Sequence, residues 1–294
     1  MDTRLRPGVR VLDRLMKANA GFSVARMTPA QLEEAQTAVI PDSGPAALFL
    51  GRMAKGVDVR MSSFPARHGE LPLRIYTPEA WCRSPRPVVV NFHGGGFVLG
   101  SARQGDWSAS IVAAELDAVV ISVDYRLAPA HRFPAAIEDC YDALLWTAEH
   151  AADLGGDPAR IGIMGDSAGG NLAAVVAIMA RDEGGPAISH QTLVYPVTDM
   201  SEAIQEDASV MLNTRGIVLS NDDMEIFREH YLDVDVDPED FRLSPLRAQF
   251  QLPDNRVDYA AAKLEVDRII DPSTDTAAVR RQLDQWERAV RGNV

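Results

Sequence analysis

Five consecutive residues, Gly165-Asp166-Ser167-Ala168-Gly169, restrict the fold of this chain more than any other feature. They follow the apolar run Arg160–Met164 and open a segment with helical character. A strand that turns at once into a helix strains the backbone of the central serine, and side chains at the flanking positions would collide. Glycines there relieve the crowding, and the helix N-terminus brings N–H groups to the serine oxygen. The pattern predicts a nucleophile, Ser167, with positive φ. A chymotrypsin-type Gly-Asp-Ser-Gly-Gly is excluded because Ala168 is inserted.

The rest of the chain alternates between strand and helix patterns. Val57–Met61 and Leu71–Tyr76 alternate apolar and polar residues, as paired antiparallel strands do. Later strand candidates are nearly continuous apolar runs, typical of parallel strands buried on both faces. Helical segments lie between them, so we predict an α/β fold with a mostly parallel central sheet flanked by helices. The expected parallel strands are Pro87–Phe92, Val119–Val123, Arg160–Met164 and Gln191–Tyr195, and the expected helices include Ala135–Ala151 and Ala168–Ala180.

Several helical segments fall outside this strand pattern. One candidate covers Val11 to Met16, and another begins at Thr28-Pro29, with Thr28 as the N-cap. Met200–Asp235 is acidic and helical, and Thr276–Arg291 places its apolar residues on one helical face. We expect N-terminal cap helices at 1–45, an α/β core at 46–199, a cap segment at 200–240 and a helical tail of the core at 241–294. The two cap segments are expected to pack together over Ser167, and the tail lacks the pattern of the last sheet strands.

A second glycine motif, His93-Gly94-Gly95-Gly96, directly follows the strand candidate Pro87–Phe92. Acyl transfer needs donors aimed at the oxyanion, and a triple-glycine loop supplies unobstructed backbone N–H groups. A plain glycine turn is the other interpretation. A phosphate loop is excluded because no lysine follows Gly100, and a dinucleotide fingerprint because Leu99 stands where its third glycine would be.

Composition limits the partners and the cellular location. The formal net charge is −13, so nucleic acid and anionic membrane surfaces would be repelled. No apolar run is long enough to span a bilayer, and the first residues lack the pattern of a secretory signal. The two cysteines, Cys82 and Cys140, fit a reduced cytoplasmic protein, and no metal-binding motif occurs.

Beyond these two sites, further motifs carry a resemblance to a known family. They are His93-Gly94-Gly95-Gly96-Phe97, Asp124-Tyr125-Arg126-Leu127-Ala128-Pro129, Phe133-Pro134-Ala135-Ala136, Gly165-Asp166-Ser167-Ala168-Gly169-Gly170-Asn171-Leu172-Ala173 and Tyr195-Pro196-Val197-Thr198-Asp199. From about Val57 to Leu246 the chain resembles the bacterial hormone-sensitive-lipase-like carboxylesterases of family IV, in the α/β-hydrolase superfamily. The resemblance implies Ser167 as nucleophile and an oxyanion hole made by the N–H groups of Gly95, Gly96 and Ala168. It also implies a helical cap, short to medium acyl ester substrates and no cofactor.

The chain departs from that family after Ser244-Pro245-Leu246. No histidine follows His230, so the family's catalytic base has no counterpart in these 294 residues. Asp271, in Asp271-Pro272-Ser273-Thr274-Asp275, is a candidate for the triad acid, but it also fits an N-cap before a helix, which we favour. The six histidines are His68, His93, His131, His150, His190 and His230, and each is expected to be structural or on the surface. His190 and His230 are the remaining alternatives for the base.

Two functions of different classes therefore remain. The first is hydrolysis of small-molecule carboxylic esters through an acyl-enzyme on Ser167, slowed by the missing base. The second is a catalytically inactive α/β-hydrolase fold that binds an acyl ligand or a partner. A damaged chain whose last strands were replaced is a third interpretation, and the sheet edge it would expose allows a homodimer.

Overall fold

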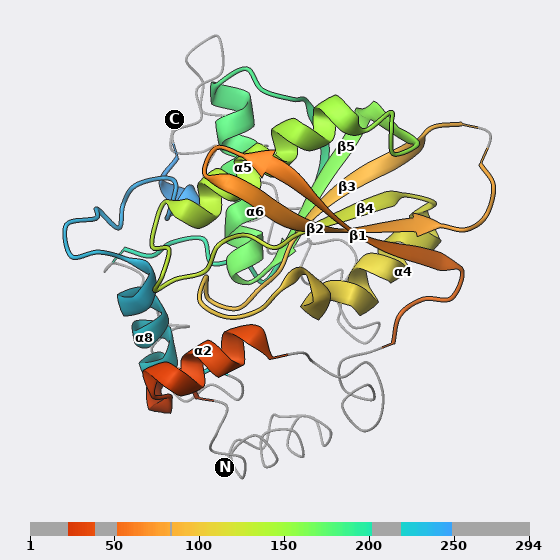
Figure 1. Cartoon of the computed structure of the whole chain (residues 1–294). Coiled ribbons are helices and arrows are strands. Elements are labelled where there is room, and N and C mark those ends of the chain that lie inside the picture. Colours follow the sequence, from red (N-terminus) through yellow and green to blue (C-terminus); the bar gives the residue numbers. More distant parts are fainter. Residues whose placement is uncertain (1–22, 39–51, 83, 202–218, 249–294) are drawn as a thin grey trace, which may run out of the picture. The chain divides into compact units, whose positions relative to one another are not determined.

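A sheet forms the centre of the structure, a computed structural model that describes residues 23–38, 52–82, 84–201 and 219–248 (Figure 1). All of these residues belong to the unit Met1–Ala248. The strands are β1 (Val57–Ala66), β2 (Gly69–Pro78), β3 (Arg86–Phe92), β4 (Val119–Val123), β5 (Gly156–Asp166) and β6 (Ile188–Val194). The helices are η2 (Val24–Arg26), α2 (Pro29–Thr37), η3 (Ala102–Gly105), α4 (Asp106–Leu116), α5 (Ala135–His150), α6 (Ala168–Asp182), α8 (Asn221–Tyr231) and η5 (Pro245–Arg247).

The sheet is mixed, and its order is β1-β2-β4-β3-β5-β6. β1 and β2 pair antiparallel, as does β2 with β4, whereas β4, β3, β5 and β6 run parallel to one another. In the middle of the sheet Val90 of β3 lies between Ile121 of β4 and Ile163 of β5. The predicted α/β fold with a mostly parallel sheet and flanking helices is confirmed.

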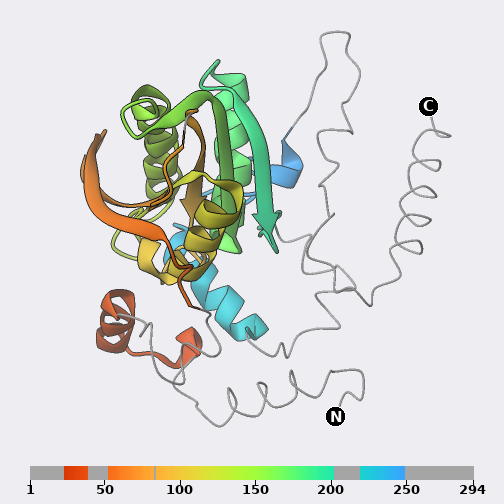
Figure 2. The same ribbon diagram turned by 90° about the vertical axis from the view of Figure 1, so that its right-hand side faces the viewer.

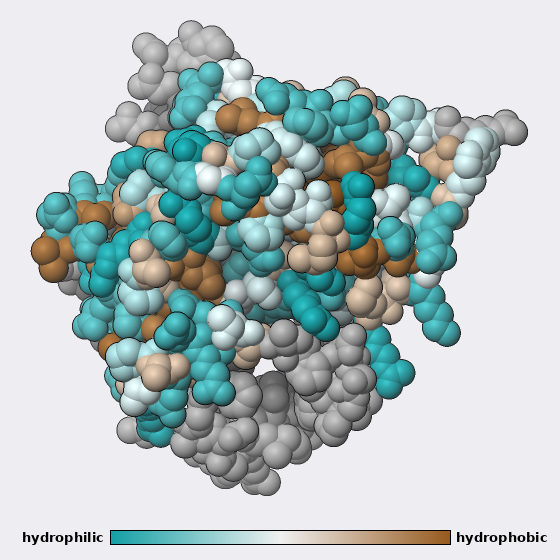
Figure 3. Space-filling model, in the orientation of Figure 1, coloured by the Kyte–Doolittle hydropathy of each residue, from teal (hydrophilic) through white to brown (hydrophobic). Residues whose placement is uncertain are grey.

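Helices cover both faces of this sheet (Figure 2). Successive side chains of a strand point to opposite faces. In β4, Val120 packs with Ala109 and Ala113 of α4, while its neighbours Val119 and Ile121 join the larger core that includes α5 and α6. The buried apolar residues of α5 and α6 thus lie on the face opposite α4. On the surface in Figure 3, hydrophilic areas are interspersed with smaller hydrophobic ones.

The sequence predicted most of these helices and strands, but it missed the helix α4 and the first residues of β6. The helix α4 was not singled out, because its exposed residues Trp107 and Ile111 blur the apolar stripe. β6 begins at Ile188, three residues earlier than expected, and its half-exposed residues hide the pattern of a buried strand. The expected helices at Val11–Met16 and Thr276–Arg291 lie outside the described residues.

The N-terminal segment η2–α2 and the helix α8 are neighbours in space although they lie far apart in the sequence. Thr28 caps α2 as expected, since its side chain accepts the Gln31 N–H and the Gln31 side chain accepts the Thr28 N–H. α8 begins with a similar box formed by Ser220 and Asp223. η2, just before α2, lies beside α8 (Figure 1, Figure 2). Within the described ranges, no helix is both long and apolar enough to cross a membrane.

Candidate active site

The two glycine motifs meet because they follow neighbouring parallel strands. Phe92, the last residue of β3, is in register with Gly165 near the end of β5. The carboxyl ends of adjacent parallel strands lie at the same edge of a sheet, where α/β proteins form their ligand sites. The Gly94 N–H donates to Oδ1 of Asp166 at 2.9 Å, which joins the loop after β3 to the turn after β5.

Ser167 forms the turn between β5 and α6. It is the N-cap of α6, with φ 52° and ψ −116°, and is half-buried. Its N–H donates to the Val194 carbonyl at 2.9 Å, and its carbonyl accepts the N–H groups of Asn171 and Val197. The predicted strand-to-helix turn with positive φ is confirmed, and backbone hydrogen bonds from β6 and α6 hold it there.

The glycines around Ser167 are there for the expected steric reason. A Cβ on Gly165 would lie 2.2 Å from the Gly169 carbonyl oxygen, and one on Gly169 would lie 2.0 Å from that of Phe92. These are backbone contacts, so no side chain can move aside. Glycine at 165 therefore lets β5 turn tightly into α6, and glycine at 169 lets the turn approach the end of β3.

The glycine loop, residues His93–Phe97, has three successive residues with positive φ. Gly95 has φ 127°, Gly96 φ 62° and Phe97 φ 64°. The first two tolerate this readily, but Phe97 is a non-glycine residue in the left-handed region, which is uncommon. Within the described residues no hydrogen bond uses the N–H groups of Gly95, Gly96 or Ala168. At the ends of β3 and β5, three N–H groups thus have no partner among the described residues.

His93 is packed inside the protein rather than presented to substrate. Its ring is 2% exposed and stacks on Tyr125, with ring centroids 4.2 Å apart. Nδ1 lies 2.8 Å from the Gly94 carbonyl oxygen, and the Tyr125 hydroxyl donates to the His93 carbonyl at 2.7 Å. Burial lowers the pKa of His93, so the ring is neutral and Nδ1–H donates to Gly94. These contacts favour the structural role expected for His93.

Asp166, the residue before Ser167, ties three segments together. Besides accepting the Gly94 N–H, its carboxylate interacts with the side chain of Tyr195, the first residue after β6. Burial raises the pKa of Asp166, and the Gly94 and Tyr195 hydrogen bonds oppose that rise only in part. A Cβ on Gly94 would lie 2.4 Å from Asp166 Oδ2, so this contact also requires glycine at position 94.

Contacts from α2 and α8 reach the glycine loop. The Gln36 amide of α2 donates to the carbonyls of Val98 and Ala128, both at 2.8 Å. The Phe227 ring of α8 lies against Gly96, since a Cβ there would be 2.5 Å from the ring. Ser23 Oγ donates to Oδ1 of Asp223 at 2.6 Å, which connects the N-terminal segment to α8.

The Ser244-Pro245-Leu246 motif is connected to the turn through α6. Asn171 is 1% exposed, and its amide donates to the carbonyls of Val197 and Leu243 at 2.7 and 2.8 Å. Ser244 is buried and accepts the Met200 N–H. Asn171, Phe227 and Asp223 were not assigned roles from the sequence. The Ser220-x-x-Asp223 capping box was a signal that could have pointed to Asp223.

The structure does not bring an imidazole to Ser167 within the described ranges. No hydrogen bond joins Ser167 Oγ to a histidine there. His68 pairs with Glu138, and His150 stacks on Trp146. His131 and His190 are exposed, and His230 is half-buried in α8. Asp271, the candidate acid, lies outside the described residues.

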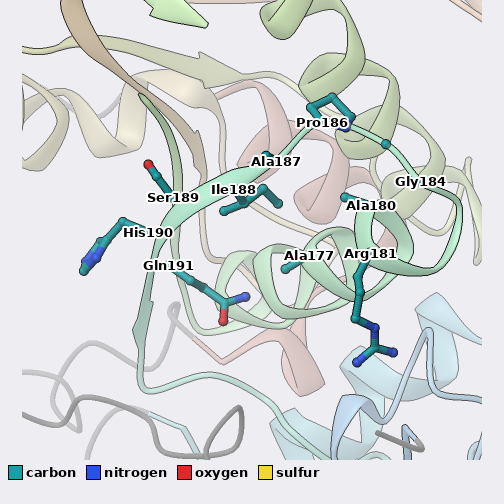
Figure 4. A pocket seen from close by; sticks show the side chains of 11 residues that line it. Ala177, Ala180, Arg181, Gly184, Pro186, Ala187, Ile188, Ser189, His190 and Gln191 are labelled. Atoms are coloured by element: carbon teal, nitrogen blue, oxygen red, sulfur yellow. The ribbon is translucent and has the colours of Figure 1, made fainter. Parts of the chain in front are cut away.

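A surface hollow of about 570 Å³ lies away from these motifs, between the end of α6 and β6 (Figure 4). Residues of α6, of the turn that follows it and of β6 line it, and neither Ser167 nor the glycine loop takes part. The hollow lies beside β6, the outer strand of the sheet within the described residues, and is therefore separate from the candidate active site.

Comparison with known proteins agrees with this arrangement. The model of the alpha/beta hydrolase fold family matches residues 89–278. LipN, a carboxylic ester hydrolase of Mycobacterium tuberculosis, is 45% identical over 199 residues, which are 66% of this chain and 52% of LipN. An ethyl acetate hydrolase of Pseudomonas putida is 34% identical over 239 residues, which are 79% of this chain and 73% of that protein. The crystal structure of an alpha/beta hydrolase enzyme from the metagenome of Lake Arreo has 33% identity and a TM-score of 0.75, and covers 84% of this chain and 76% of that one.

The chain therefore belongs to the alpha/beta hydrolase fold family. Within it, the chain is a member of the hormone-sensitive-lipase-like group to which the sequence motifs pointed. The matched region spans about half the length of two relatives: 52% of LipN and 47% of the carboxylesterase NlhH of the same species.

Proposed function

We propose that this protein hydrolyses small-molecule carboxylic esters through an acyl-enzyme on Ser167. The observation that carries the proposal is the position of Ser167, at a positive-φ turn that the Gly94–Asp166 hydrogen bond joins to the glycine loop. Backbone donors fixed at the site of a developing oxyanion are worth about 3 kcal/mol each in related chemistry. The relatives, which are named ester hydrolases, support the same reaction.

In this proposal Ser167 Oγ attacks the acyl carbon and the three N–H groups hold the oxygen as it becomes negative. The alcohol leaves, and water then releases the acid from Ser167. No cofactor is needed, because each step is a proton transfer or an acyl transfer. A serine without a bonded base loses about three to six powers of ten in rate. We therefore expect slow turnover of short-chain aryl esters, well below about ten per second.

The test is Ser167→Ala, assayed with p-nitrophenyl butyrate and by intact-mass spectrometry after exposure to an activated phosphonate. We expect the adduct and the residual hydrolysis to disappear together. Hydrolysis that survives in Ser167→Ala would contradict the proposal. Labelling of Ser167 without any turnover would instead favour the second function, binding of an acyl ligand. Parallel assays of His190→Ala and His230→Ala would identify either as the base if the rate falls.

A helical cap is part of the proposal, formed from residues 1–45 and 200–240 and closing over Ser167. Its support is the Ser23–Asp223 hydrogen bond, which joins the two segments, and the Phe227 contact with Gly96. Limited proteolysis with and without a phosphonate adduct tests it, since a cap over Ser167 should be protected by the adduct.

Two further proposals concern the cellular location and the oligomeric state of the protein. We infer a cytoplasmic location, supported by the free thiols of Cys82 and Cys140. A homodimer is supported by the exposed residues of β6, the outer strand among those described. Light scattering at several protein concentrations tests the dimer.

A further inference from the structure

The strained part of the glycine loop lies under helix α8. Phe97 keeps φ 64° although it is not glycine, and its side chain is 2% exposed. Such a conformation persists only where surrounding contacts over-determine it. The ring of Tyr231, at the end of α8, stacks on the Phe97 ring with centroids 4.0 Å apart and planes 4° from parallel.

A second aromatic side chain of α8 reaches the same loop one helical turn earlier. Phe227 lies four residues before Tyr231, so both rings project from the same face of the helix. The Phe227 ring lies against Gly96, whose N–H is one of the proposed oxyanion donors. Both rings are nearly buried, Phe227 at 8% and Tyr231 at 1% exposure.

The C-terminal end of α8 is itself fixed to the core. Nη1 of Arg132 donates to the carbonyls of Glu229 and Leu232 at 2.7 and 2.6 Å, and the Phe133 N–H donates to the Tyr231 carbonyl at 2.9 Å. The Phe133 ring also meets the Tyr231 ring edge to face. Tyr231 thus stands on a rigid support from which it can restrain the glycine loop.

We propose that Tyr231 and Phe227 are positioning residues that keep the Gly95 and Gly96 N–H groups aimed at the oxyanion, by clamping Phe97 and Gly96. This rests on the proposed esterase function and deepens it. Neither side chain needs to touch the acyl group for this role. Helix α8 then influences the rate of acyl transfer through the glycine loop.

Tyr231 offers a matched pair of substitutions. Tyr231→Phe keeps the stacked ring, and the hydroxyl has no hydrogen bond within the described residues. Tyr231→Leu keeps apolar bulk but removes the stack. Met224→Ala, on the same helix with Met224 44% exposed, is the control for a general effect on α8.

The experiment measures phosphonylation of Ser167 and ester hydrolysis in parallel. In phosphonylation by a p-nitrophenyl phosphonate, Ser167 Oγ forms the bond to phosphorus, p-nitrophenolate leaves and the serine proton goes to the buffer. We expect Tyr231→Leu to lower this rate and kcat together by about tenfold to a hundredfold, with KM nearly unchanged. Tyr231→Phe and Met224→Ala should match the original protein.

Three results would overturn the inference: an unchanged rate in Tyr231→Leu, an effect confined to KM, or equal damage from Tyr231→Phe. All assays are run well below the unfolding midpoint of each variant. If Tyr231→Leu does not fold, Phe227→Leu takes its place, with the same expected loss in kcat. Failure of the proposed function looks different, because the original protein itself would then form no adduct at Ser167.

Discussion

The turn at Ser167 and the glycine loop both contain a non-glycine residue with positive φ, but they are held in different ways. Ser167 is fixed by the Val194 carbonyl on the neighbouring strand and by its own helix through Asn171. The Phe97 carbonyl accepts the Ala128 N–H, and its ring stacks on Tyr231, more than a hundred positions away. The carbonyl of the next residue, Val98, accepts from Gln36. The turn is held by the sheet and by its own helix, whereas the loop is held by the core and, in addition, by α2 and α8.

This difference separates two requirements of the proposed chemistry. The nucleophile can hold its shape whenever β5, α6 and β6 are folded. The oxyanion donors in the glycine loop also need α2 and α8 in place. Damage to the core should therefore unfold the protein, whereas damage to α2 or α8 should leave a folded protein with weaker catalysis.

The largest expected effect comes from breaking the turn itself. Gly169→Ala would place a Cβ 2.0 Å from the Phe92 carbonyl oxygen, where neither backbone can yield. We expect a loss of about 3 kcal/mol in the free energy of unfolding, measured in urea. The control is Gly162→Ala in β5, whose Cβ would meet nothing closer than 3.4 Å and should cost less than about 1 kcal/mol. Equal losses would show that the turn is not the constrained point.

Next comes the link between the turn and the Ser-Pro-Leu segment. Asn171→Ala removes one buried and one partly buried hydrogen bond, to the carbonyls of Leu243 and Val197. We expect about 2 kcal/mol of destabilisation by thermal or urea unfolding. Gln191→Ala, which loses a single bond to the Ala173 carbonyl, should cost about 0.5 kcal/mol. If Asn171→Ala lowered the free energy of unfolding by no more than Gln191→Ala does, Asn171 would not be a structural link between the turn and the Ser244-Pro245-Leu246 segment.

A smaller and more local effect is expected at Asp223. Burial works to raise the pKa of Asp223, but hydrogen bonds from Ser220, Ser23 and Ala25 outweigh it, and the net pKa is lowered. A carboxylate with a lowered pKa contributes stability above its unfolded value of about 4, and that stability is lost as the pH falls below it. We expect amide protection in η2 and α8 to drop below about pH 4, before protection in β3 and β5.

Asp223→Asn should reproduce that loss at neutral pH, by about 1 kcal/mol, because an amide offers only one accepting oxygen to these donors. The exchange of η2 and α8 should then no longer respond to acid. If the sheet loses protection in parallel with α8, the two regions are not separable and the comparison fails.

The smallest effect is expected at Gln36, the contact between α2 and the backbone after Phe97. Gln36→Ala removes two partly buried hydrogen bonds, worth about 1 kcal/mol together. The free energy of unfolding should fall by about that amount, while the rate of Ser167 phosphonylation falls about threefold. Glu34→Ala on the same helix is the control and should leave that rate unchanged.

Sequence patterns sufficed where the determining interactions are local. The strands β3 and β4, the cap at Thr28 and the turn at Ser167 follow from apolar runs, a capping residue and paired glycines within a few positions. The triple-glycine motif predicted oxyanion donors, and the resemblance to known esterases assigned that role to the N–H groups of Gly95, Gly96 and Ala168, which stays a prediction. α4 and the start of β6 were missed, because their partly exposed residues weaken the periodic signal.

The sequence by itself determined the α/β class, the nucleophile candidate and the steric need for glycine beside it, since each depends on residues that are neighbours in the chain. Only the tertiary structure decided that Asp223 joins the N-terminal segment to α8, and that Tyr231 and Phe227 lie on the glycine loop. Those contacts join segments more than a hundred positions apart, and no local pattern encodes them. Their geometry exists only when the strand ends have brought the loop under the helix.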